Sequence, residues 1–165
     1  LLLRERETVE ALFVLRADIA GDPWSGHVAL PGGHADPADP DLLDTARREL
    51  REETGLALDR GAYLGRLDDL GPSTRRLPAV AVTPWVAWHE GDESIRINAE
   101  LRGHLWIPLP ALAHPDHRSE LRLRREDEAL VFPSIEFGGY TIWGLTFRIV
   151  DDFLTALEEP SPPSA

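Results

Sequence analysis

Short apolar runs, interrupted by polar and turn-forming residues, recur along the chain and predict strands. The runs at 1–3 and 9–16 flank the charged residues 4–7, which predicts a hairpin whose second strand is well buried. Pro84 interrupts the longest of the other runs and indicates an edge position or a bulge there. The remaining strands are expected at 27–30, 61–67, 77–89, 101–107 and 140–143, and 121–132 is expected to form a charged hairpin arm.

Helical spacing of apolar residues marks two longer segments. In 41–54 the leucines fall on one side, an aspartate stands at the start, and Gly55 follows as a residue suited to a left-handed C-cap. A short third helix, opened by proline, is expected at 108–113. The segment 144–157 is expected to bury Val150, Phe153, Leu154 and Leu157. Because strands and helices alternate irregularly, the pattern predicts an α/β protein with layers around a mixed sheet.

Composition restricts the class of protein further. The 165 residues, 42% of them hydrophobic, suit one domain, expected over 1–159, and the Pro-rich end at 160–165 is expected to be a disordered tail. Neither an apolar run of roughly 18 residues nor a basic-then-apolar leader is found, so no membrane partner is expected and the cytoplasm is the expected location. The chain contains no cysteine, which excludes disulfides and thiolate chemistry, and a net charge of -12 argues against a nucleic-acid partner. Since it begins at Leu1 and contains no methionine, the sequence is expected to lack its true start.

Three glutamates, Glu49, Glu52 and Glu53, carry the strongest chemical signal. Their spacing of three and four residues is expected to place them on one helix face, where like charges repel by roughly 0.2–0.5 kcal/mol per pair. A hard divalent cation, Mg²⁺ or Mn²⁺, selects carboxylate oxygens and would reverse this repulsion. Arg48 is placed to hold one of the carboxylates in a fixed orientation. The alternative is a solvated charged face that binds nothing.

The glycine pair Gly32-Gly33 favours the metal interpretation over the solvated face. It ends a predicted strand and precedes a loop of prolines and aspartates that leads into the acidic helix. Glycine allows a backbone to approach a phosphate or to offer a carbonyl oxygen to a metal. Strand, glycine loop and acidic helix together predict a metal and phosphate site.

These residues resemble the Nudix hydrolase family, whose box is G-x5-E-x7-R-E-U-x-E-E-x-G-U, with U aliphatic. The segment 48–56 matches the second half of the box at every specified position. In the first half the loop is one residue longer and Asp39 stands where the first glutamate would fall. The longer loop at 31–39 and the segments 45–49, 105–109 and 142–146 resemble the coenzyme A diphosphatase branch.

The resemblance implies a Nudix-like α/β/α sandwich that hydrolyses a nucleoside diphosphate linked to another group. It implies that Glu49, Glu52 and Glu53 bind Mg²⁺ or Mn²⁺ and that Arg48 orients them, with the general base left open between Glu52, Glu53 and Glu100. The candidate substrate-binding residues are Gly32, Gly33, Arg16, Arg75 and Arg76. The alternative interpretation places Arg75 and Arg76 in a solvated turn.

The substrate is expected to be a small diphosphate, coenzyme A or a derivative of it. That branch carries several basic residues before its glycine pair, and here the segment 17–26 carries none. The alternatives are a nucleotide-sugar or dinucleotide pyrophosphatase and a catalytically silent ligand-binding module. A homodimer is a further candidate for assembly.

The histidines and tryptophans predict less. The six histidines are scattered without the spacing of a zinc site. Trp24 could stack on a base, but a structural role is favoured for it and for Trp85, Trp88, Trp106 and Trp143, which lie on predicted strands. Gly138-Gly139 is expected to form a turn between strands.

Overall fold

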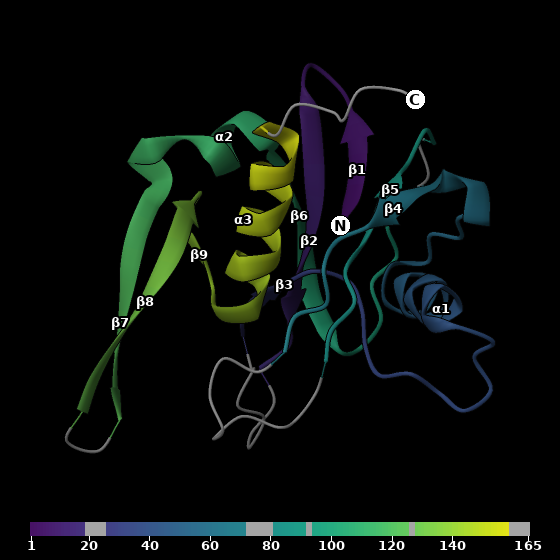
Figure 1. The fold of residues 1–165 in the computed structure, drawn as a ribbon, viewed down its shortest axis with the longest axis horizontal. Helices are drawn as coiled ribbons and strands as arrows, with labels where there is room; N and C mark the ends of the chain where they lie inside the picture. The colour runs from purple at the N-terminus through teal and green to yellow at the C-terminus, as the bar shows by residue number, and fades with distance from the viewer. Residues whose placement is uncertain (19–25, 72–80, 92–93, 126–127, 159–165) are drawn as a thin grey trace.

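The structure, a computed structural model, describes residues 1–18, 26–71, 81–91, 94–125 and 128–158. A six-stranded sheet lies at its centre, with strand order β3-β2-β1-β5-β4 and β6 paired to β2 (Figure 1). The sheet is mixed, because β1 and β5 run parallel whereas the other pairs are antiparallel. Its strands are β1 (Leu2–Glu5), β2 (Val9–Arg16), β3 (Val28–Ala29), β4 (Tyr63–Arg66), β5 (Trp85–Trp88) and β6 (Leu101–Pro108).

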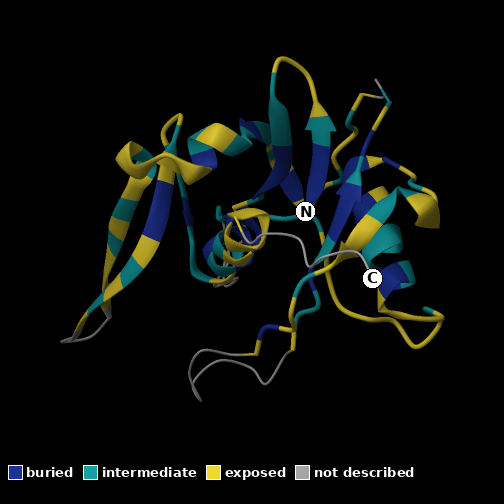
Figure 2. Ribbon diagram, turned by 45° about the horizontal axis from the view of Figure 1, so that its top comes forward, coloured by how far each residue is buried: buried dark blue, intermediate teal, exposed yellow. Residues whose placement is uncertain are grey.

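A second sheet of three antiparallel strands has the order β7-β8-β9 and projects from the body as a long hairpin arm (Figure 1). Its strands are β7 (Arg118–Arg125), β8 (Glu128–Phe137) and β9 (Tyr140–Trp143). Gly138 and Gly139, both at positive φ (58° and 82°), make the turn between β8 and β9, as expected. Exposed residues dominate the arm toward its tip, whereas buried residues line the strands at the centre of the molecule (Figure 2).

Helices cover both faces of the central sheet. They are α1 (Leu42–Thr54), α2 (Leu109–Ala113) and α3 (Gly144–Glu158), with short 3₁₀ helices at Arg60–Ala62 and Pro115–His117. Because side chains alternate along a strand, Leu3 and Phe13 join α3 residues in one core cluster, whereas Leu2 and Leu12 join Leu50 of α1 in the other. The α/β/α sandwich with a mixed sheet is therefore confirmed.

Most of the expected elements are confirmed, including the first hairpin, the three helices and the charged arm. One predicted strand, 77–89, is wrong in its extent: β5 contains only Trp85–Trp88, and residues 77–80 lie outside the described chain. Pro84 precedes the strand and its carbonyl oxygen accepts a hydrogen bond from the Leu67 N–H at 2.9 Å. Proline has no N–H to donate to a sheet, so β5 begins after it.

A second correction concerns Leu157, which was expected on the buried side of α3. Its side chain is 58% exposed, whereas Val150, Phe153 and Leu154 are buried. Leu157 lies in the last turn of α3, where it borders a surface hollow beside Val9 and Leu109 and is not packed in the core. Residues 160–165, the expected tail, lie outside the described residues. Within the described part of the chain, no helix is long and apolar enough to cross a membrane.

Candidate active site

Helix α1 carries the acidic residues, and both of its ends are capped. The Asp41 carboxylate accepts a hydrogen bond from the Asp44 N–H at 2.8 Å at the N-terminus. At the C-terminus Gly55 adopts a left-handed conformation (φ 75°) and donates its N–H to the Arg51 carbonyl at 2.9 Å. The caps determine where the helix begins and ends and thus which way each glutamate points.

Arg48 connects the loop before α1 to the acidic residues. Its Nε and Nη2 donate to the two carboxylate oxygens of Asp39, each at 3.0 Å. Its third nitrogen, Nη1, donates to Glu49 at 2.7 Å and to Glu52 at 3.1 Å. The His34 carbonyl accepts a further hydrogen bond at 3.0 Å. Arg48 thus contacts two of the three glutamates that it was expected to orient.

Asp39 holds the Arg48 guanidinium in place, a role that the sequence did not predict for it. It also accepts hydrogen bonds from the Thr45 hydroxyl at 2.8 Å and the Asp36 N–H at 3.0 Å. The hydrogen bonds from Arg48 hold the pKa of the Asp39 carboxyl well below its usual range. Asp39, at the end of the longer loop, thus forms a bidentate pair with Arg48 of α1.

The glycine pair packs directly against the acidic helix. The Gly32 N–H donates to the Glu53 carboxylate at 3.0 Å. A Cβ atom on Gly33 would overlap the carboxyl group of Glu49, so a larger residue at position 33 would displace that carboxyl group from its contact with Arg48. Glu49 and Glu53, one helical turn apart, therefore both face the glycine turn.

Glu53 is the buried carboxylate of the site, with only 5% of its surface exposed. Burial, helped by the negative charges of Glu49 and Glu100, raises the pKa of Glu53 to about 7, against the opposing effects of the Gly32 hydrogen bond and the charge of Arg16. A carboxyl group with this pKa exchanges a proton near neutral pH.

The remaining expected residues are placed differently. Glu52 is exposed (55% of its side chain) and is bound only through Arg48 among the contacts of the described residues. Glu100 is brought to Glu53 by the segment before β6, where the Asn98 N–H donates to the Glu53 carbonyl at 3.3 Å and the Glu100 N–H to the Asn98 side chain at 3.0 Å. Arg75 and Arg76 lie outside the described residues.

A divalent cation suits this donor set. Among the described residues, no three His, Asp or Glu side chains are gathered closely enough to hold a metal ion as they stand. The negative charges of Glu49 and Glu100 nevertheless help to raise the pKa of the buried Glu53, and hard cations such as Mg²⁺ and Mn²⁺ prefer carboxylate oxygen ligands. The residues that could hold such an ion are Glu49 and Glu53, with Glu52 at the edge of the group.

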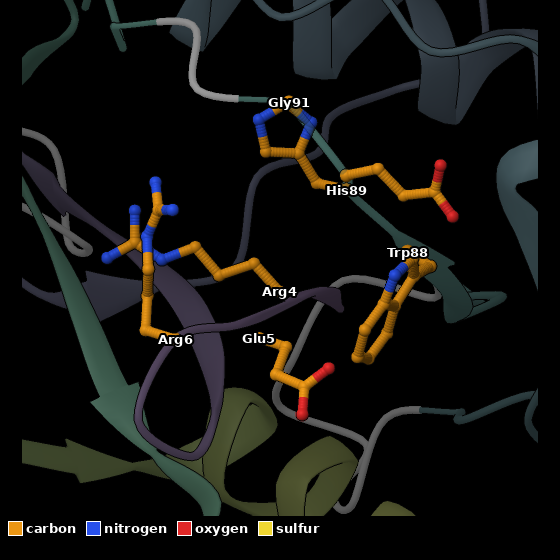
Figure 3. A pocket seen from close by; sticks show the side chains of 7 residues that line it. Arg4, Glu5, Arg6, Trp88, His89 and Gly91 are labelled. Atoms are coloured by element: carbon orange, nitrogen blue, oxygen red, sulfur yellow. The ribbon is translucent and has the colours of Figure 1, made fainter.

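A pocket of about 290 Å³ lies away from this site, between the end of β1 and the end of β5 (Figure 3). Arg4, on its wall, is already paired with Glu10 at 2.7 Å and lies over the Trp106 ring. Its other lining residues include Arg6 and His89, and none of the predicted site residues. The pocket is therefore separate from the glycine and glutamate site.

A family model described as the NUDIX domain matches residues 1–126. Human mitochondrial coenzyme A diphosphatase NUDT8 is 30% identical over 151 residues, which cover 90% of this chain and 63% of that protein. The chain thus spans less than two thirds of the length of this relative.

Two solved structures share the fold. A MutT/nudix family protein from Enterococcus faecalis has a TM-score of 0.64 at 20% identity, over 96% of this chain and 60% of that one. The NUDIX domain of NrtR from Shewanella oneidensis, solved with ADP ribose, has a TM-score of 0.53 at 25% identity, over 66% of this chain and 68% of that one.

Proposed function

The chain belongs to the Nudix family, and we propose that it is a divalent-metal-dependent diphosphohydrolase that cleaves a nucleoside diphosphate linked to another group. The observation that carries the proposal is the buried Glu53 carboxylate, held against the Gly32 N–H and next to Glu49. A charged carboxylate is stable in such a position when a cation neutralises it.

In this proposal Glu49 and Glu53 hold Mg²⁺ or Mn²⁺, with Glu52 as a further ligand. When bound, such an ion neutralises the diphosphate charge and lowers the pKa of a bound water. The chain's own contribution is positional: Arg48 fixes Glu49 and Glu52, Asp39 fixes Arg48, and the Gly32-Gly33 turn brings the backbone within reach of a phosphate. Arg16 places a positive charge beside Glu53, where it can also meet the substrate phosphates.

The proton acceptor is one of Glu52, Glu53 and Glu100. The pKa of Glu53, about 7, lies near the operating pH, which favours a proton acceptor. Glu100 is exposed and reaches the site from the segment before β6, where it is free of the metal-binding role assigned to α1. Replacing each by glutamine and comparing the pH dependence of kcat assigns the role, because the acceptor's loss removes the acidic limb of the profile.

The substrate is proposed to be coenzyme A or a derivative, on the strength of the similarity to the human coenzyme A diphosphatase. Because 17–26 holds no basic residue to grip a 3′-phosphate, we expect coenzyme A and dephospho-coenzyme A to be cleaved with similar kcat/KM, within about threefold. Both are assayed with Mg²⁺ and with Mn²⁺, beside ADP-ribose, a nucleotide sugar and a dinucleotide.

The outcomes of this panel separate two levels of the proposal. A clear preference for coenzyme A over the dephospho form would assign a 3′-phosphate contact to arginines outside 17–26, such as Arg75 or Arg76. A preference for ADP-ribose, the ligand of the NrtR domain, over both would overturn the coenzyme A assignment and leave the diphosphohydrolase. Hydrolysis of none of them would overturn the enzyme itself.

Metal binding is expected to be visible in thermal stability. Mg²⁺ or Mn²⁺ at millimolar concentration should raise the Tm of the chelator-treated protein by several degrees, because the ion binds only the folded arrangement of Glu49 and Glu53. The shift should shrink in Glu53→Gln and persist in Asp152→Asn, an exposed position on α3. Absence of a shift with either ion would favour the silent ligand-binding module.

A further inference from the structure

The arm formed by β7 and β8 extends well beyond the strand that supports it. The two strands pair with each other over eight positions, whereas β9 pairs with β8 only at residues 134–137. The distal part of the arm is therefore a ribbon of two strands, and it projects away from the body of the molecule (Figures 1 and 2). Because an isolated two-stranded ribbon is marginally stable in water, a further layer packed on one of its faces would stabilise it.

One face of this ribbon is apolar. The register pairs Leu121 with Phe132 and Leu123 with Leu130. Because side chains alternate along a strand, all four lie on the same side of the ribbon. Leu123 is 36% exposed and the other three are partly exposed, and neither core cluster of the described residues contains any of them. At the base of the arm the Trp143 ring, 5.4 Å from that of Phe132, continues the same face. We call these five residues the arm face.

The opposite face of the arm is turned toward α3. Arg118 of β7, which alternates with the leucines, forms an ion pair with Asp151 of α3 at 2.7 Å. Ile135, the partner of Arg118 in the register, is fully buried in the core cluster that contains the α3 residues. The arm face therefore points away from α3. A contiguous apolar surface on a projecting element is typical of a protein interface.

The distribution of charge favours a second copy of this chain as the partner. The segment 118–135 contains four arginines and four acidic residues, so the net charge of -12 is carried by the rest of the chain. Two copies repel each other where their acidic bodies meet, but not where neutral arms meet. In an antiparallel pair of arms the bodies lie at opposite ends. Strands of eight residues, about 27 Å long, then separate them by more than the Debye length of about 8 Å.

We propose that two copies of this chain associate through their arm faces, with the arms antiparallel about a two-fold axis near Leu121 and Phe132. Each surface then contacts its own counterpart, as a two-fold interface requires, and Leu123 near the tip of one arm meets Trp143 of the partner subunit. A stable interface buries about 800 Å² per partner, which is more than a two-stranded face supplies, so the dimer is weak, with a micromolar Kd. The proposal does not depend on the proposed function, because the arm face contains no residue of the active site.

Sedimentation velocity of the full chain, at concentrations from about 1 to about 200 μM, tests the association. We expect the mean mass of the wild type to rise toward that of two chains. Leu123→Glu places a charge within the arm face and should weaken the association at least tenfold. Its matched control is Val131→Glu, which adds the same charge to the opposite face of the arm at a position that is 50% exposed. The control should leave the Kd within about threefold of the wild-type value.

Cross-linking tests the same contact without adding a charge. The chain contains no cysteine, so a single introduced cysteine reports on its own position. Leu121→Cys, near the expected two-fold axis, should give a covalent dimer with a short bis-maleimide reagent, and Val131→Cys on the opposite face should give much less at the same concentration. This pair keeps the proposal testable if Leu123→Glu fails to fold by circular dichroism.

Three results would overturn the proposal. A wild type that stays monomeric at about 200 μM would leave the arm face to a different partner. Equal weakening by Leu123→Glu and Val131→Glu would place the contact between copies elsewhere on the chain. Equal cross-linking of the two cysteine variants would have the same meaning.

Discussion

Glu53→Gln should reduce kcat/KM by at least a hundredfold, equivalent to about 3 kcal/mol of transition-state stabilisation, while the protein stays folded. Glutamine has the same shape and its side-chain oxygen can still accept the Gly32 N–H, so the glycine turn should keep its position. The substitution removes the negative charge of a side chain that is only 5% exposed. In the proposed mechanism this charge holds the metal.

The measurement is steady-state hydrolysis at saturating Mg²⁺ and again at saturating Mn²⁺, with circular dichroism to verify the fold. Asp152→Asn, which also removes one carboxylate charge but from an exposed position on α3, should keep wild-type activity. Wild-type turnover by Glu53→Gln with metal present would contradict the assignment of Glu53. Recovery of part of the activity at higher metal concentration would place the defect in metal affinity.

Metal-free wild-type protein should lose stability as the pH rises from about 4.5 to about 7, and Glu53→Gln should not show this loss. The pKa of Glu53 is raised by burial from 4.5 to about 7 in the folded state. Between these values the folded protein therefore holds a proton that the unfolded chain has released, so unfolding becomes easier as the pH rises. At 1.36 kcal/mol per pKa unit, the contribution reaches at most about 3 kcal/mol and is constant above pH 7.

Other groups act in or near this window and have to be separated from Glu53. The pKa of Asp39 is held down by Arg48, so its stabilising contribution is already complete at pH 4.5. Burial and the charge of Arg4 lower the pKa of His104, which adds stability as the pH rises through its ordinary value of 6.5. The measured quantity is therefore the difference between wild type and Glu53→Gln in urea unfolding with chelator, at steps from pH 4.5 to pH 8. A difference that stays constant over these steps would contradict the raised pKa.

Local sequence patterns determined the elements of this protein and the family to which it belongs. The apolar run at 9–16, the apolar side of 41–54 with its capping residues, and the glycine turn at 138–139 can each be recognised from residues close together in the sequence, and the structure has all three elements. The contact of Arg48 with Glu52, four residues further along the helix, follows in the same way from helical spacing.

Extents and burial at element ends were harder to predict, because they depend on distant partners. The predicted strand at 77–89 is reduced to β5, since the proline at position 84 cannot donate to a neighbouring strand and β5 pairs only where β1 and β4 meet it. Leu157 continues the helical spacing of α3, but it borders a surface hollow beside Val9 and Leu109, whereas Phe153 is packed in the core.

Only the tertiary structure decided which glutamate is buried and which rings meet. Glu52 and Glu53 are adjacent in a sequence that predicts one shared face, yet the glycine turn covers Glu53 and leaves Glu52 in solvent. Trp143, Phe132 and His27 belong to three segments far apart in the sequence, and β9 must lie against β3 before they form a cluster. Residue type and spacing determine what a local segment can form, whereas desolvation and the meeting of distant side chains depend on how the segments pack.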